Sequence, residues 1–219
     1  MSTLMTSGAV KKKEGGRGAA RRGYHHGDLA RALLDEAGRA LREGGPDALS
    51  LRALARALGV DAAAPYRHYA SKEALLAALA REGFAALARA MEEAWARGGE
   101  PLQRFRRLGE AYVLFALEDG ARFRLMFGPL GSGPGALPRE PGTGASGRTP
   151  YALLEAGLDA LGAAGLARTP VRRHVLPAWS AVHGLALLLV EGPLRGTPLA
   201  QARRQARAVC DVVLAGIRP

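Results

Sequence analysis

The sequence has little of what disulfide-bonded, membrane-spanning or β-rich proteins need. Its single cysteine, Cys210, cannot form a disulfide within the chain, which predicts a protein of the reducing cytoplasm. The longest apolar runs, such as 185–190, are far shorter than the roughly 20 residues that span a bilayer, so we expect no membrane partner. Aromatic residues make up only 5% of the chain, and Val, Ile and Thr are scarce. Because Ala, Leu, Arg and Glu dominate, the composition favours an all-helical fold.

Positive charge is in excess, with 31 Lys and Arg against 20 Asp and Glu, and it is unevenly distributed. Residues 1–23 hold six basic side chains and one acidic side chain, whereas 24–80 hold seven of each. The first segment is also rich in glycine and has no hydrophobic period, so we expect a disordered basic arm that binds a polyanion. A purely solubilising tail is the alternative interpretation of this arm.

Helical periodicity and helix-stopping residues predict three short helices in the first part of the chain. The first begins near Asp28 and ends at 44–46, where the sequence is Gly-Gly-Pro. A helix of about two turns follows Ser50, which offers an N-cap oxygen. Gly59 marks a tight turn, after which we expect a third short helix at 62–69.

The rest of the chain continues the helical pattern without a segment of strand period. Further helices are predicted at 72–97, 102–120, 122–127, 151–161, 170–190 and 198–216. At 1.5 Å per residue the first of these would be a rod of roughly 35–40 Å. Gly and Pro crowd residues 128–149, which we expect to form a mobile loop. Pro177 is expected to kink or split the helix that contains it.

Two short helices separated by a glycine turn are typical of the helix-turn-helix, whose second helix enters the major groove of DNA. Such a helix of eight residues is roughly 12 Å long, which is comparable to the groove width of about 12 Å. Tyr66, Arg67 and His68 place hydrogen-bond donors along it. Lys72 follows at the N-terminus of the next helix, where it can bind phosphate.

The same spacing also fits a piece of an ordinary helical bundle. The alternative function is therefore a helical protein-interaction module whose basic arm binds acidic partners without operator specificity. Enzymatic functions are disfavoured, because the five histidines include no i, i+4 metal-binding pair and the chain has no phosphate-binding loop. We expect neither catalytic residues nor a metal nor another cofactor.

Several runs of residues resemble the DNA-binding domain of transcriptional regulators of the tetracycline-repressor (TetR/AcrR) family. The runs are 24–29 (YHHGDL), 49–52 (LSLR), 58–60 (LGV), 65–69 (PYRHY) and 71–76 (SKEALL). The resemblance implies three N-terminal helices that bind operator DNA and a long fourth helix as linker. It also implies a divergent helical domain that binds a ligand and dimerises.

The resemblance, taken position by position, assigns a set of residues to double-stranded operator DNA, to which we add Arg67 and two cations of the arm. The set is Ser50, Arg52, Ala62, Ala63, Ala64, Tyr66, Arg67, His68, Lys72, Arg21 and Arg22. Asp61 departs from the Ser or Thr common in the family; its carboxylate still caps a helix but repels phosphate. The three alanines offer no donors, so base reading would rest on thymine methyl groups, on Arg67 or His68 and on DNA shape.

The C-terminal half carries a looser resemblance, in the pattern Trp179-x-x-x-His183-Gly184 that is seen in one subgroup of these regulators. The Trp and His side chains are four residues apart and share a helix face. With other bulky residues they would line a pocket for a small apolar effector. The predicted ligand-binding residues are Phe105, Tyr112, Phe115, Phe123, Met126, Phe127, Trp179 and His183. Only a minority of them is expected to touch the ligand, because apolar residues at helical spacing usually build core.

The prediction is therefore a disordered arm at 1–23, a helix-turn-helix DNA-binding domain at 24–80 and a ligand-binding and dimerisation domain at 81–219. The last two helices would join a homodimer and set two recognition helices about 34–36 Å apart, matching successive major grooves. The residues predicted at this interface are Leu187, Ala202, Ala206, Val209 and Val213. A ligand that tilts the fourth helix would spoil the spacing and release a repressor. An activator or a nucleoid-type binder without effector is the further alternative.

Overall fold

The structure, a computed structural model, describes residues 26–128 and 142–219, and every regular element in these two stretches is helical. The predicted arm and loop residues 129–141 lie outside them. The elements are α1 (His26–Gly44), η1 (Pro46–Ala48), α2 (Leu51–Ala57), η2 (Ala64–Arg67), α3 (Lys72–Ala96), α4 (Pro101–Glu118), α5 (Gly120–Phe127), α6 (Pro150–Ala163), η3 (Val171–His174), α7 (Val175–Val190) and α8 (Leu199–Ile217). The predicted all-helical fold class is confirmed.

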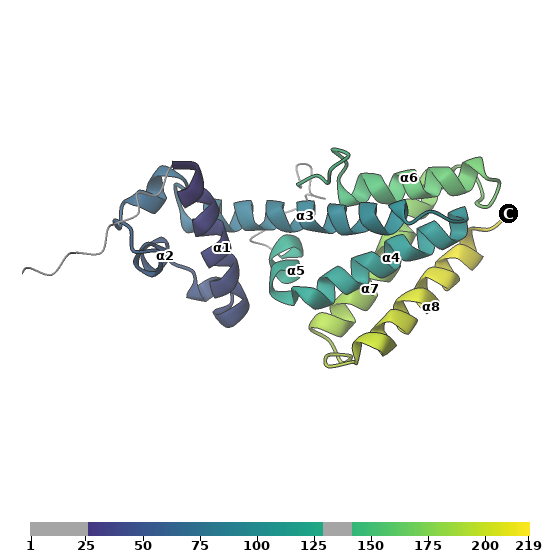
Figure 1. The fold of residues 1–219 in the computed structure, drawn as a ribbon. Coiled ribbons are helices and arrows are strands. Elements are labelled where there is room, and N and C mark those ends of the chain that lie inside the picture. The colour runs from purple at the N-terminus through teal and green to yellow at the C-terminus, as the bar shows by residue number, and fades with distance from the viewer. Residues whose placement is uncertain (1–25, 129–141) are drawn as a thin grey trace, which may run out of the picture.

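The molecule is elongated, because α3 runs out of one helical bundle into another (Figure 1). α1 and α2 lie at one end with the beginning of α3, whereas α4, α5 and α6 pack against its later part. With 25 residues α3 is about 37 Å long, which agrees with the predicted rod. The helix begins after Ser71, whose Oγ accepts a hydrogen bond from the N–H of Ala74 at 3.2 Å.

The N-terminal bundle has a leucine-rich core produced by the apolar stripe of α1. Leu33, Ala37 and Leu41 recur at intervals of four residues, and each is at most 1% exposed. They pack with Leu54 of α2 and Leu79 of α3. The helical period of α1 therefore fixes the face that α2 and α3 cover.

The third helix differs from the prediction over 62–69. It is a four-residue 3₁₀ helix flanked by turns, and the N–H of Tyr66 donates to the carbonyl of Ala63 at 3.2 Å. Pro65 has no N–H to donate to the carbonyl four residues back, which favours the tighter winding. Oδ1 of Asp61 accepts from the N–H of Ala63 at 2.8 Å, in the turn before the 3₁₀ helix, which itself begins at Ala64 without a side-chain cap.

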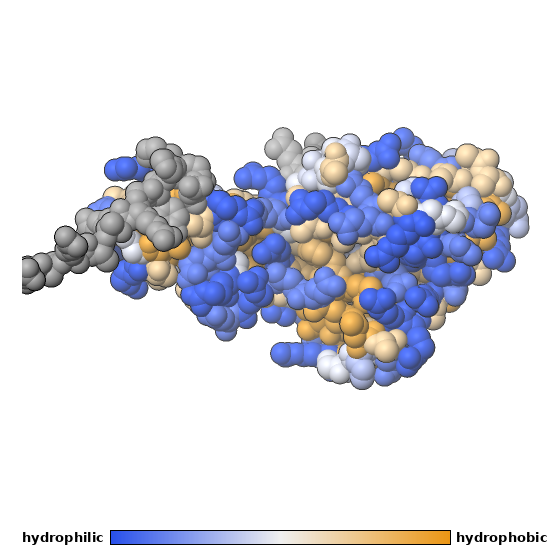
Figure 2. All heavy atoms as spheres, in the orientation of Figure 1, coloured by the Kyte–Doolittle hydropathy of each residue, from blue (hydrophilic) through white to orange (hydrophobic). Residues whose placement is uncertain are grey.

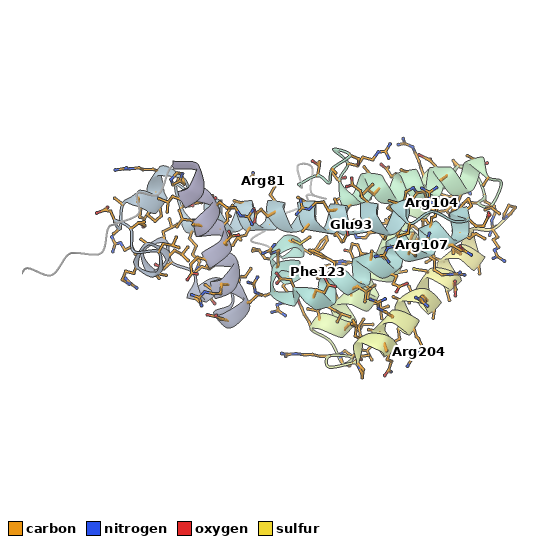
Figure 3. The ribbon with its side chains drawn as sticks, in the orientation of Figure 1. Arg81, Glu93, Arg104, Arg107, Phe123 and Arg204 are labelled. Atoms are coloured by element: carbon orange, nitrogen blue, oxygen red, sulfur yellow. The ribbon has the colours of Figure 1, made fainter. Side chains whose placement is uncertain are left out.

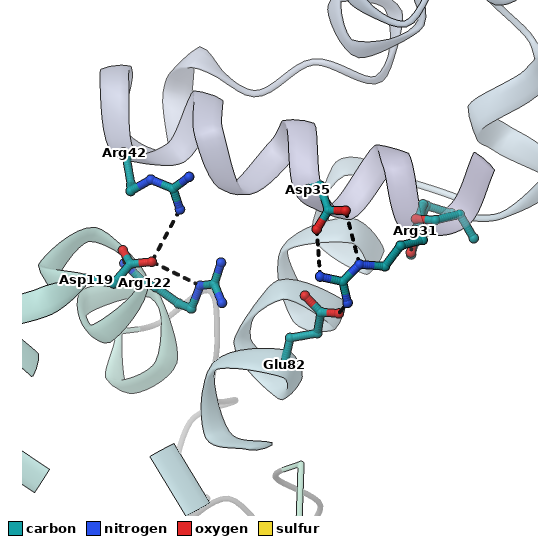
Figure 4. Close-up of polar contacts among 8 residues, drawn as sticks. Arg31, Asp35, Arg42, Glu82, Asp119 and Arg122 are labelled. Atoms are coloured by element: carbon teal, nitrogen blue, oxygen red, sulfur yellow. Dashed lines mark hydrogen bonds and ion pairs between the residues drawn. The ribbon is translucent and has the colours of Figure 1, made fainter. Parts of the chain in front are cut away.

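Ion pairs tie the N-terminal bundle to the rest of the molecule (Figure 4). Arg42 of α1 lies 3.4 Å from the Asp119 carboxylate, which lies 3.3 Å from Nε of Arg122 on α5. Nearer the start of α1, a nitrogen of Arg31 lies 2.6 Å from a Glu82 oxygen on α3. Two helices of the second bundle, α3 and α5, thus hold the orientation of α1.

α4 is the centre of the C-terminal bundle and contacts α3, α5, α6, α7 and α8. The helical pattern at 170–190 is split, as predicted, into η3 and α7. Pro177 lies in the first turn of α7, where an N–H would have no helical partner. Val171–Val190 is long and apolar enough to cross a membrane by length and composition alone. The buried part of this stretch packs against α4 and α8, whereas Leu176 and Leu188 are exposed.

The inward face of α8 is lined by small side chains. Ala202, Ala206 and Cys210 are spaced by four residues, and each is at most 1% exposed within this single chain. The approach to α4 is so close that Gly109 has no room for a Cβ beside the Cys210 sulfur. The prediction that Ala202 and Ala206 form a dimer interface is therefore corrected. Periodicity identified an apolar face but could not say that the chain itself covers it.

Candidate functional site

The residues predicted to face DNA around η2 lie on its exposed side and in the turn before it. Ala62 and Ala63 are exposed and Ala64 is half-buried, while Pro65 points into the bundle. Tyr66 is 48% exposed, which is unusual for so large a ring in a packed bundle. The buried Pro65 holds this short helix against the bundle, and Tyr66 and Arg67 then face solvent.

Basic and hydroxyl side chains flank η2 on both sides in sequence. Ser50 and Arg52, at the start of α2, are exposed, and Ser50 makes no capping hydrogen bond there. Arg67 is exposed, and Lys72 lies half-buried in the first turn of α3, where unpaired backbone N–H groups favour an anion. These positions can bind phosphate.

The remaining members of the predicted set are His68, Arg21 and Arg22. His68 is half-buried, so it offers less surface than Tyr66 does. Tyr69, which follows His68, packs inward, and its hydroxyl donates to the carbonyl of Ala30 at 3.3 Å. Arg21 and Arg22 lie outside the described residues.

The C-terminal bundle contains a cavity of about 350 Å³ between α3, α4, α5, α6, α7 and α8. Its walls are mostly apolar, and none of the described lining residues carries a formal charge. They are Phe84, Met91, Phe105, Leu108, Gly109, Tyr112, Phe127, Thr149, Pro150, Tyr151, Leu154, Ala178, Trp179, Val182, Cys210 and Val213. The volume lies at the lower end of the range for small-molecule pockets, about 300–1,000 Å³.

Four of the predicted ligand-binding residues line this cavity: Phe105, Tyr112, Phe127 and Trp179. His183 does not line the cavity, but its Nδ1 lies 2.8 Å from the hydroxyl of Tyr112, which is a lining residue.

Phe115, Phe123 and Met126 are corrected from ligand-binding to core residues. Phe123 and Met126 have no exposed surface, and Phe115 is only 9% exposed. Phe123 points into the bundle (Figure 3). Met126 packs over Gly83 of α3, which has no room for a Cβ. Only the end of α5 reaches the cavity, through Phe127.

The lining residues that the sequence did not predict come from α3, α4, α6, α7 and α8. Phe84 and Met91 lie seven residues apart on α3, which puts them on one face. That spacing is a usable signal for two side chains that face the cavity together. Tyr151 and Leu154 follow the glycine-rich segment, and nothing in their pattern points to a cavity.

A hydrogen-bonded network joins three side chains at one wall of the cavity. Nε1 of Trp179 donates to the hydroxyl of Tyr112 at 3.2 Å, and the same hydroxyl lies 2.8 Å from Nδ1 of His183. Burial raises the pKa of Tyr112 and lowers the pKa of His183, so both are uncharged at neutral pH. The ring of Phe127 lies 4.6 Å from His183 and closes the cluster.

A carboxylate of α3 fixes the segment that precedes α6. Glu92 accepts hydrogen bonds from the N–H of Ala145 at 2.8 Å, from the N–H of Ser146 at 3.0 Å and from the Ser146 hydroxyl. Thr149 then caps α6, since its Oγ1 accepts from the N–H of Ala152 at 3.1 Å. These bonds hold the start of α6 against the cavity.

Comparison with known proteins gives matches to both halves of the chain. Residues 33–79 match the bacterial regulatory proteins of the tetR family, and residues 105–213 match the tetracyclin repressor-like C-terminal domain. No curated protein matches the chain.

Solved structures agree over most of the length. A protein of unknown function from Rhodococcus sp. RHA1 is 34% identical, with a TM-score of 0.75 over 91% of this chain and 100% of that chain. The TetR family transcriptional regulator PfmR from Thermus thermophilus is 27% identical, with a TM-score of 0.60 over 85% of this chain and 99% of that one. A regulatory protein in the tetR family from Rhodococcus RHA1 shares the fold at 20% identity and a TM-score of 0.61, covering 84% and 96%.

An N-terminal helix-turn-helix with solvent-facing donors, a long connecting helix and a cavity-bearing helical domain thus coincide with two family matches. The members of this family are regulators rather than enzymes, and the chain belongs to the TetR family of DNA-binding transcriptional regulators.

Proposed function

We propose that this regulator is a repressor that binds its operator as a two-fold dimer and leaves it when a small apolar molecule enters the cavity. The observation that carries the proposal is the sharing of α3 between the two ends of the molecule. Phe84 and Met91 of this helix line the cavity, and Lys72 of the same helix stands beside η2. A ligand that moves α3 therefore moves the DNA-facing surface.

The second connection between the two ends is α5. Phe127 at its end lines the cavity, and Asp119, which caps its start, accepts from the N–H of Arg122 at 3.1 Å. The Asp119 carboxylate also pairs with Arg42 of α1. A coupling free energy of about 1–3 kcal/mol between the sites suffices for a useful switch.

The outward faces of α7 and α8 supply the surface for a second copy. Leu176 and Leu188 on α7 are 59% and 44% exposed, and Val212 on α8 is 73% exposed. Gly184 has open space where a Cβ would be, so packing within the chain does not explain it. Figure 2 shows apolar surface in the region of α4 and α7 within largely hydrophilic surroundings. Large exposed apolar side chains on adjacent helices mark an interface.

On DNA, the proposed contacts are those of η2 and the starts of α2 and α3. Ala62 and Ala63 would face the bases, while Tyr66 and Lys72 would bind the phosphate backbone. The cations of the arm would add sequence-independent affinity that falls steeply with salt.

Selection of bound fragments from genomic DNA, followed by footprinting, tests the proposal. We expect a discrete palindromic site whose affinity falls at least tenfold in the double variant Tyr66→Ala/Lys72→Ala. Arg97→Ala is the matched control, because this exposed cation directly follows α3, at the opposite end of that helix from Lys72. Binding lost only on deletion of residues 1–23, with no discrete footprint, would instead indicate a nonspecific basic tail.

A further inference from the structure

We infer that the ligand recognised in the cavity is an uncharged molecule that donates one hydrogen bond, from a hydroxyl or N–H group, to the phenol oxygen of Tyr112. The inference rests on the proposed function, because it names the ligand class of the same cavity. Two independent observations carry it: the charge of the walls, and the hydrogen-bonding capacity that the Tyr112 network leaves unused.

The first observation is the absence of charge from the described walls of the cavity. The carboxylate that lies nearest in sequence to a lining residue of α3 is Glu92, beside Met91. Its two oxygens already accept hydrogen bonds from Ala145 and Ser146. An ion entering the cavity would lose its hydration without gaining a counter-charge, which is costly in an apolar site. Aromatic faces attract cations, but this attraction offsets only part of that cost.

The second observation is the donor and acceptor balance at Tyr112. The indole N–H of Trp179 can only donate, so it occupies one lone pair of the Tyr112 oxygen. If Nδ1 of His183 also donated to that oxygen, the buried Tyr112 proton would have no acceptor among its recorded contacts. The arrangement that gives the Tyr112 proton an acceptor has Tyr112 donating to Nδ1 of a neutral His183, which is then protonated at Nε2.

One lone pair of the Tyr112 oxygen then remains without a protein donor. Tyr112 lines the cavity together with Trp179, so this lone pair belongs to the wall that a ligand meets. Thr149 and Tyr151 are the other hydroxyl-bearing residues of the wall, and Oγ1 of Thr149 already accepts from the N–H of Ala152 while its own proton stays available. A ligand that donates a hydrogen bond to Tyr112 completes the network. A ligand that only accepts gains no bond there, because the Tyr112 and Trp179 protons already take part in hydrogen bonds within the protein.

Four naphthalene probes of similar size test both parts of the inference by calorimetric titration of the full chain without DNA. They are 1-naphthalenemethanol, its methyl ether, 1-naphthoate and 1-naphthylmethylammonium. We expect the alcohol to bind most tightly, the ether about three- to tenfold more weakly, and both ions at least tenfold more weakly than the alcohol. In Tyr112→Phe the alcohol and the ether are expected to bind equally well. The ratio of the alcohol affinity to the ether affinity is measured within one variant. An unfolded fraction of that variant lowers both apparent affinities equally and leaves their ratio unchanged.

Equal binding of the alcohol and the ether to the wild type, tight binding of either ion, or no binding of any probe would overturn the inference. Operator release by the alcohol is measured separately. If the alcohol binds as expected but leaves operator affinity unchanged, the proposed function fails while the ligand class stands. If a charged molecule binds the cavity tightly and releases the operator, the ligand class fails while the proposed function stands.

Discussion

At the residue scale, His183 shows how burial selects a protonation state. Its Nδ1 faces the Tyr112 hydroxyl, and its ring lies among those of Phe123, Phe127 and Trp179. None of these groups is an anion that could stabilise an imidazolium. Burial therefore lowers the pKa of His183 below its ordinary value of 6.5.

The lowered pKa predicts a loss of stability in mild acid. Below about pH 6.5 the unfolded chain binds a proton at His183 that the native chain does not bind, so the free energy of unfolding decreases as pH falls toward the native pKa. One such proton contributes at most about 1.4 kcal/mol per pH unit. Urea unfolding at about pH 7 and about pH 5.5 measures this change.

His183→Gln is the comparison for this prediction, because it keeps a polar side chain near Tyr112 but does not titrate. The variant is expected to lose less stability between the two pH values than the wild type does. The other four histidines are present in both proteins and cancel. Identical pH dependence in the two proteins would show that His183 does not titrate with a lowered pKa.

The ligand site could be predicted only in part, because close helix contacts at small residues decide which side chains are buried. The Trp179 and His183 pair was predictable, since i, i+4 spacing places two side chains on one helix face. The assignment of Phe123 and Met126 to the core was not, because it depends on how closely α5 approaches Gly83. Sequence spacing gives the face of a helix but not the depth to which each side chain is covered.

At the scale of elements, most helices were predictable because their apolar residues recur with a period near 3.6 and Gly or Pro residues end them. The exception at η2 arises from Pro65, which removes one helical hydrogen bond from a segment too short to compensate. The exception at α8 has another origin. Its most apolar face was assigned to a partner copy, although α4 covers Ala202 and Ala206.

The short helix α5 is the element whose position can link ligand and DNA, because it contacts α1, α3 and α4. We predict that Arg42→Ala leaves operator affinity nearly unchanged but weakens the effect of bound ligand on that affinity by about two- to fivefold. The pair between Arg42 and Asp119 is partly exposed and spans 3.4 Å, so its loss should cost stability only about 0–1 kcal/mol.

Arg39→Ala is the matched control for this prediction, because among the residues that the structure describes Arg39 pairs only with Glu36 and Glu43 of its own helix. The measurement is the ratio of operator affinities without and with saturating 1-naphthalenemethanol, in each variant. Equal ratios in the Arg42 and Arg39 variants would argue that α3 alone transmits the effect of the ligand.

At the scale of the whole molecule, the proposed dimer presents two DNA-facing ends to the operator, and their separation must be fixed. Successive major grooves on one side of B-DNA lie about 34–36 Å apart, so a two-fold dimer must hold both copies of η2 at that distance. One chain supplies a single DNA-facing end, at the opposite end of α3 from α8 (Figure 1). The interface on α7 and α8 is therefore proposed to set the spacing.

The last prediction follows from this geometry: Leu188→Glu/Val212→Glu converts the protein to a folded monomer with weak operator binding. Both side chains are exposed in the single chain, so their replacement should leave the unfolding transition of the protomer nearly intact. In the dimer, two carboxylates on each copy would face each other across the proposed interface and repel. Sedimentation measures the mass, and Ala96→Glu, an exposed site at the end of α3, controls for added charge. A double variant that still sediments as a dimer would exclude this face as the dimer interface. A wild type that is monomeric and yet gives a palindromic footprint would show that the dimer does not set the spacing.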